Sequence, residues 1–153
     1  MYPKVLVPLD GSALAECALR HVRGLARDGS MGEATLLNIV RIDIPWGGEF
    51  GTRAAVDINA IRERALGNAR KYLEKMESQL GADGVNVQTA AVEDNWPAYA
   101  ILDYAKNHGM DLIVMATHGR TGIKKMMLGS VALKVLHESP VPVLLIRPEA
   151  CCV

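Results

Sequence analysis

The sequence of 153 residues is poor in cysteine, has no excess of charge of either sign and lacks a long apolar run. Its three cysteines are an odd number without C-x-x-C spacing, which argues against a disulfide framework and a structural zinc site. Lysine and arginine together number 17, as do aspartate and glutamate. This balance argues against a nucleic-acid coat or a polybasic membrane anchor. No apolar run approaches the roughly 20 residues needed to cross a bilayer.

The cysteines themselves predict little chemistry. Cys17 shares a helical face with Leu14, Ala18 and Val22, so we expect it to pack as a small apolar side chain in the core. Cys151 and Cys152 form an adjacent pair in a terminal segment. Two interpretations remain open for this pair: that the two thiols are redox-active, or that they are incidental exposed thiols. We favour the second.

Half of the residues are hydrophobic, which predicts a folded chain with a substantial core. We expect one domain over residues 1–148 and a short tail over 149–153. The opening stretch "MYPKVLVPLDGS" has only a short apolar run, which ends at Asp10 and is not typical of a signal peptide. We therefore expect a soluble, cytoplasmic protein.

Short apolar segments alternate with segments of helical periodicity along the whole chain. The apolar segments predict strands over 4–9, 33–42, 85–92, 111–116 and 143–146. The periodic segments predict helices over 12–27, 56–80, 97–108 and 130–138. Strands that alternate with helices indicate an α/β fold, a single open parallel five-stranded sheet with right-handed crossovers and helices on both faces.

Two loops follow predicted strands with unusual chemistry: "PLDGS" after the first strand, and "ATHGRTGIKKMMLGS" after the fourth. In open parallel sheets, ligands bind beyond the carboxyl ends of the strands where the strand order reverses. If the first and fourth strands are neighbours at that point, both loops face one crevice.

The second loop suits a phosphate chain. Gly129 and Ser130 precede a predicted helix, whose first N–H groups and dipole favour an anion. Further positive charge is available in the same loop from His118, Arg120, Lys124 and Lys125. The alternative is that Ser130 merely caps the helix. Neither G-x-x-x-x-G-K-[ST] nor G-x-G-x-x-G after the first strand is present, so this is neither an ordinary P-loop nor a classical dinucleotide fold.

Asp10 is the charged residue of the first loop. A carboxylate repels phosphate, so in this crevice it is expected to meet the nucleoside end or to reach phosphate through a divalent cation. The alternative is an Asx-type turn or helix cap in a plain strand-to-helix connection. The residue types leave both readings open.

These features together resemble the universal stress protein family, whose nucleotide-binding members carry G-x2-G-x9-G-[ST] after the fourth strand. Here the corresponding residues are Ala116 to Gly119, then nine residues, then Gly129 and Ser130. Ala116 stands in place of the first glycine and adds a methyl group there. The resemblance covers essentially the whole chain, including "VLVPLDGS", "DLIVMATHGR" and "PVPVLLIRP".

The resemblance implies a sheet of order 3-2-1-4-5, a homodimer through the last strand, and binding of ATP, or of ADP or AMP, with Mg²⁺ or Mn²⁺ held through the phosphates. It implies that Pro8, Leu9 and Asp10 line the adenosine end, with backbone groups of Ile39 at the adenine. Met115 and Ala116 then pass beneath the ribose. The residues implied at the phosphates are His118, Gly119, Arg120, Gly129, Ser130 and Val131.

Three functions remain open. We favour a nucleotide-dependent regulator in the stress response that acts on an unknown protein partner. The second is a slow ATPase or phosphotransferase using the same pocket, for which His118 is the candidate group. The third is a nucleotide-free dimer that serves as an interaction module.

Overall fold

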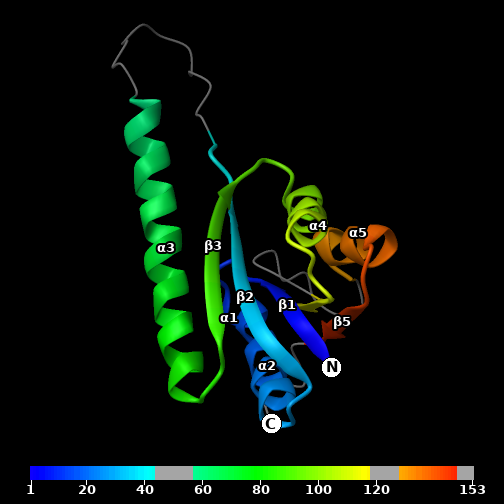
Figure 1. The fold of residues 1–153 in the computed structure, drawn as a ribbon. Coiled ribbons are helices and arrows are strands. Elements are labelled where there is room, and N and C mark those ends of the chain that lie inside the picture. The colour runs from blue at the N-terminus through cyan, green and yellow to red at the C-terminus, as the bar shows by residue number, and fades with distance from the viewer. Residues whose placement is uncertain (44–56, 118–127, 148–153) are drawn as a thin grey trace, which may run out of the picture.

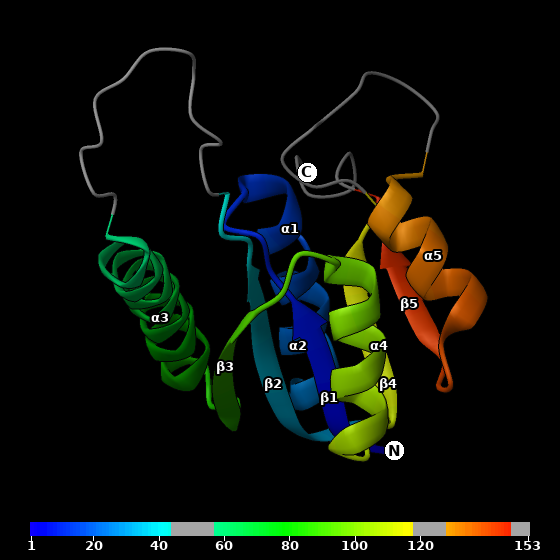
Figure 2. The ribbon, with the colours of Figure 1, turned by 90° about the horizontal axis from the view of Figure 1, so that it is seen from above.

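The strands form one parallel sheet of order β3-β2-β1-β4-β5 (Figure 2). The computed structural model describes residues 1–43, 57–117 and 128–147. The observed sheet confirms both the predicted parallel arrangement and the strand order that the family resemblance implies. The strands are β1 (Tyr2–Pro8), β2 (Met31–Val40), β3 (Val87–Glu93), β4 (Leu112–Ala116) and β5 (Val143–Ile146).

The three inner strands are apolar because both of their faces are covered. All five residues of β4 are buried, and β1 buries Val5, Leu6 and Val7 completely. Such runs lack the alternation of a half-exposed strand, as expected for a parallel sheet between two helical layers. β1 lies between β2 and β4, with Leu6 in register with Thr35 and with Ile113.

Helices pack on both faces of the sheet (Figure 1). One core cluster joins the sheet to α1 (Ala13–Glu16), α2 (Ala18–Arg27) and α3 (Ile58–Ala82). The other joins the opposite face to α4 (Pro97–Asn107) and α5 (Ser130–Glu138). Pro97 begins α4, as predicted, since the first helical turn does not need its missing N–H. No helix within the described ranges is long and apolar enough to cross a membrane.

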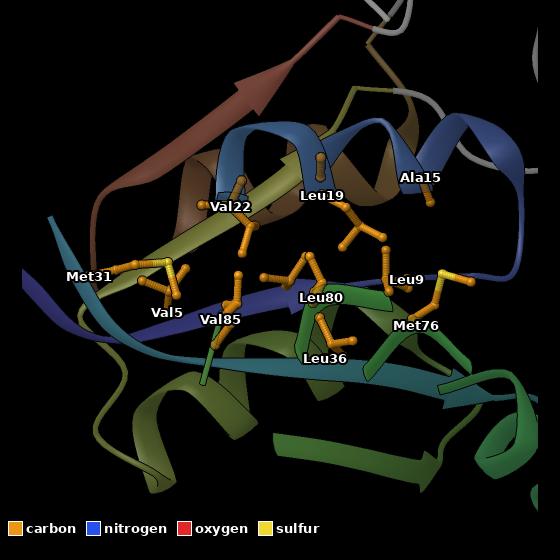
Figure 3. Packing of buried hydrophobic residues seen from close by; sticks show 14 of the residues in the cluster. Val5, Leu9, Ala15, Leu19, Val22, Met31, Leu36, Met76, Leu80 and Val85 are labelled. Atoms are coloured by element: carbon orange, nitrogen blue, oxygen red, sulfur yellow. The ribbon is translucent and has the colours of Figure 1, made fainter. Parts of the chain in front are cut away.

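In the first cluster, Leu36 of β2 lies among Leu9, Met76 and Leu80, with α1 and α2 above them (Figure 3). Residues of β2 at odd and even positions serve different faces. Leu36 belongs to the cluster of α1, α2 and α3, whereas Leu37 belongs to the cluster of α4 and α5. This alternation fixes the direction of every side chain up to the end of the strand.

The single helix predicted over 12–27 is wrong in one respect, because the structure divides it at Cys17. The Cys17 N–H bonds to the carbonyl oxygen of Leu14, three residues back, at 3.3 Å. Cys17 is half-buried and disulfide-bonded, so the expectation that it packs as a core thiol is also wrong. The other two cysteines, Cys151 and Cys152, lie outside the described residues.

Candidate functional site

A cleft of about 770 Å³ lies over the carboxyl ends of the strands. It occupies the place where β1 and β4 are neighbours and the chain order reverses, which is where doubly wound sheets bind ligands. Every predicted site residue within the described ranges lines it: Pro8, Leu9, Asp10, Ile39, Met115, Ala116, Gly129, Ser130 and Val131. The remaining three, His118, Gly119 and Arg120, lie outside the described residues.

At the end of β1, Asp10 organises the turn into α1. Its Oδ1 accepts the Ser12 N–H at 2.9 Å and the Ser12 hydroxyl at 2.5 Å. The Ser12 Oγ in turn accepts the Ala15 N–H at 3.1 Å and caps the helix. Gly11 has a φ of 82°, a conformation that favours glycine. The Asx-turn alternative for Asp10 is therefore confirmed, whereas the cap of α1 is Ser12 and not Asp10. Asp10 also lines the cleft.

The start of α5, a helix of nine residues, lies on the other side of the cleft. Gly129 is its N-cap, and Leu133 N–H bonds to the Gly129 carbonyl oxygen at 2.9 Å. The alternative that Ser130 caps this helix is wrong, because Ser130 is its first helical residue. No side chain caps the helix among the described residues.

The backbone N–H groups that are available to a ligand at the start of α5 differ from those expected, because that of Gly129 is not among them. The Gly129 N–H donates to the Thr117 carbonyl oxygen at 2.8 Å, so it does not point at a ligand. The first N–H groups of a helix have no partner within the helix. Those of Ser130, Val131 and Ala132 are therefore the donors that the cleft offers to an anion.

At the end of β2, backbone groups face the space beyond β1. The Leu9 N–H bonds to the Leu37 carbonyl oxygen, and the Asp94 N–H bonds to that of Val40. Peptide groups of a strand alternate between its two neighbours, so those of Ile39 point, like those of Leu37, toward β1. Because β1 ends at Pro8, they face the cleft.

Sequence reasoning missed the residues that reach the cleft from α3 and from the end of β2. They are Asn38, Val40, Arg41, Asp43, Ala65, Asn68, Ala69 and Tyr72. No local motif marks them, since α3 is brought to the cleft only by packing against the sheet. It also missed Thr117, which is 5% exposed and whose N–H bonds to the Ile146 carbonyl oxygen at 2.8 Å.

Among the described residues, the two titratable groups with a clear shift in pKa do not line the cleft. Burial raises the pKa of Tyr104, and the hydrogen bond to Glu138 raises the pKa of Lys134. Within the described ranges, no three side chains of histidine, cysteine, aspartate or glutamate are grouped to hold a metal ion. The described cleft thus combines apolar walls, the carboxylates of Asp10 and Asp43, the guanidinium of Arg41 and helix N–H donors.

An open parallel sheet with helices on both faces and a cleft at its carboxyl edge defines a Rossmann-like α/β protein. The chain matches the Universal stress protein family over residues 1–147, and it belongs to that family.

Similar proteins match this chain over nearly its whole length. It is 33% identical over 150 residues to the universal stress protein YxiE of Bacillus subtilis, which covers 96% of this chain and 100% of the relative. It is 31% identical over 157 residues to the universal stress protein MJ0577 of Methanocaldococcus jannaschii, covering 96% of each. A solved structure of MJ0577 has a TM-score of 0.79 at 28% identity, covering 96% of both chains.

Proposed function

We propose that this universal stress protein binds ATP, or ADP or AMP, in the cleft at the carboxyl edge and serves as a nucleotide-dependent regulator. The observation that carries the proposal is that all nine described residues expected at a nucleotide line one cleft. Its volume of about 770 Å³ falls within the range of about 300–1,000 Å³ that is usual for ligand pockets.

The chemistry of the cleft fits the parts of a nucleotide. The N–H groups of Ser130, Val131 and Ala132, with the α5 dipole behind them, suit the phosphates. Asp10 lies at the end of β1 and suits the ribose hydroxyls as a hydrogen-bond acceptor. The backbone of Ile39 suits the base. In this arrangement Mg²⁺ or Mn²⁺ is held through the phosphates.

Two other solved structures bear on this proposal through their fold. A universal stress protein in complex with cAMP has a TM-score of 0.65, and an Arabidopsis thaliana family member with AMP bound has a TM-score of 0.66. At 22% and 16% identity these likenesses extend to the fold alone. The proposal for this chain therefore rests on its own cleft.

The proposal extends to assembly. β5 is an edge strand, and an apolar edge invites pairing unless it is covered. A homodimer through β5, a cytoplasmic location and an unidentified protein partner complete the proposed picture of a regulator.

Nucleotide carried through purification provides the direct test. The purified protein is denatured, and the released small molecules are identified by mass spectrometry. We expect an adenine nucleotide, and calorimetric titration of the nucleotide-free protein is expected to give binding of ATP. Absence of both would contradict the proposed function and favour the nucleotide-free interaction module.

A further inference from the structure

Asn38 is a buried polar side chain at the end of β2. It is 8% exposed, and it follows Leu36 and Leu37, which are fully buried. Within the described ranges its side-chain amide forms no hydrogen bond with the protein. An amide has two N–H donors and an acceptor oxygen, and leaving such groups unsatisfied in the interior costs about 1–3 kcal/mol. A buried amide of this kind therefore requires an explanation.

The direction of Asn38 follows from the strand. Side chains two apart on a strand share a face, so Asn38 points to the same side of the sheet as Leu36. Leu36 packs in the cluster formed with α1, α2 and α3 (Figure 3). Asn38 lines the cleft, so its amide occupies the part of the cleft on the α1 and α3 side.

Small and apolar side chains form much of the wall around this part of the cleft. They are Ala15 of α1, Ala69 of α3, Val40 of β2 and Leu9, which follows β1, and α3 adds the uncharged polar side chains of Asn68 and Tyr72. The Tyr72 hydroxyl donates to Glu16 Oε1 at 3.1 Å and ties α3 to α1. A flat apolar ring with a polar edge fits such a lobe better than a charged group does, because alanine, leucine and valine side chains do not solvate a charge.

The edge of adenine matches the Asn38 amide. Adenine presents its 6-amino donor beside a ring-nitrogen acceptor, and asparagine pairs with such an edge through one donor and one acceptor. We propose that the Asn38 side-chain amide reads the base edge and selects adenine. This inference rests on the proposed nucleotide function and names the residue that sets its base specificity.

A purely structural role predicts different behaviour. If the amide only fills space, Asn38→Leu removes an unsatisfied polar group for an apolar one of similar size, and nucleotide affinity stays unchanged. If the amide reads the base, the same variant loses affinity for adenine nucleotides in particular. The affinity for each base therefore separates the two roles.

The experiment measures calorimetric affinities of nucleotide-free protein for ATP, for GTP and for purine riboside triphosphate, which lacks the 6-amino group. The variants are Asn38→Leu and Asn38→Asp. The matched control is Thr35→Val, because Thr35 is a buried polar residue of the same strand that does not line the cleft. Thermal unfolding of each variant checks that it is folded.

We expect Asn38→Leu to bind ATP at least about tenfold more weakly, and Thr35→Val to bind it as the wild type does. The wild type is expected to prefer ATP to purine riboside triphosphate, and Asn38→Leu to bind the two alike. Asn38→Asp is expected to shift the preference from ATP toward GTP, since a carboxylate accepts from the guanine N–H groups.

The outcomes separate the inference from the function on which it rests. If the wild type binds ATP and Asn38→Leu binds it within about twofold, the inference is overturned and the proposed function stands. If Asn38→Leu does not fold, the wild type alone decides: equal affinity for ATP and purine riboside triphosphate overturns the inference. If the wild type binds no nucleotide, both are overturned.

Discussion

The backbone N–H of Gly129 donates a hydrogen bond to the carbonyl oxygen of Thr117 at 2.8 Å. Thr117 is in turn bonded through its own N–H to Ile146, so the residue after β4 is fixed to both α5 and β5. The start of α5 is thereby held at the carboxyl end of β4, beside the cleft. In the proposed function, this places the N–H groups of the first helical turn at the phosphates.

Gly129→Val tests that placement. Gly129 has φ −59° and ψ 148°, which valine also adopts, so the fold and the bond to Thr117 are expected to survive. The branched side chain is expected to crowd the approach of phosphate and to weaken ATP binding at least tenfold, or about 1.4 kcal/mol. Calorimetric titration measures the loss.

A matched control is Gly81→Val on α3, where no atom other than those of the adjacent residues and of the helix's own backbone lies within 4 Å of an added Cβ. It is expected to leave ATP affinity unchanged. Unaltered affinity in a folded Gly129→Val variant would refute the proposed phosphate position.

A second pair of variants separates the two roles of Asp10. Ser12→Ala removes the cap of α1 and is expected to lower the free energy of unfolding by about 1 kcal/mol, with little effect on ATP affinity. Asp10→Ala removes the hydrogen bond that forms the turn before α1, and it also removes the carboxylate in the cleft. It is expected to weaken ATP binding at least about tenfold, since hydrogen bonds to a charged group contribute about 1.5–3 kcal/mol.

Urea unfolding and calorimetric titration of both variants give the two quantities. Should Ser12→Ala weaken ATP binding as much as Asp10→Ala does, Asp10 acts only by shaping the turn, and its contact with the nucleoside is refuted.

The parallel sheet was predictable from regularities along the chain, whereas the order of its strands, and with it the place of the cleft, followed from the resemblance to the family. Apolar runs such as that of β4 define buried parallel strands, and α5 begins at Ser130 and ends at Glu138, as predicted. Strand ends shifted by a few residues, as in β1, predicted over 4–9 and observed over Tyr2–Pro8. Such ends are set by pairing with β2, which a single segment does not reveal.

Features that depend on one hydrogen bond were not predictable. The break at Cys17 and the bond of the Gly129 N–H to Thr117 leave the apolar periodicity unchanged. The same holds for Asn38, whose sequence context "LLNIV" reads only as a strand. Its importance follows from burial, from the face on which it lies and from the neighbouring α3, all of which are properties of the fold.

A third prediction concerns hydrolysis. We expect any ATP hydrolysis with Mg²⁺ or Mn²⁺ to be slower than about one turnover per second, the lower end of ordinary enzymes, since binding needs no positioned water. Phosphate release by the wild type and by His118→Ala is compared. A lower rate in His118→Ala would favour the enzyme reading, and several turnovers per second in the wild type would overturn the regulator as the leading function.

The fourth prediction is that the protein is a homodimer whose two β5 strands pair antiparallel. β5 is paired with β4 on one side: Ile113 N–H bonds to the Pro142 carbonyl oxygen, and Thr117 N–H bonds to that of Ile146. Peptide groups alternate between the two sides of a strand, so those of Val143 and Leu145 point to the open edge. A two-fold related copy satisfies them and forms a symmetric interface.

Leu145→Pro is the sharpest test of this interface. Proline lacks the N–H that points outward at this position, and an edge strand tolerates proline there because the ladder to β4 is untouched. A lysine at Leu144 or Leu145 is less selective, since it keeps the outward N–H group and places a charge where these side chains pack against the core clusters. We expect light scattering at micromolar concentration to give a dimeric mass for the wild type and a monomeric mass for Leu145→Pro.

Leu136→Lys, at an exposed position of α5 outside the strand, is the control and is expected to remain dimeric. A monomeric wild type would rule out the dimer, and a dimeric, folded Leu145→Pro would place the interface away from β5.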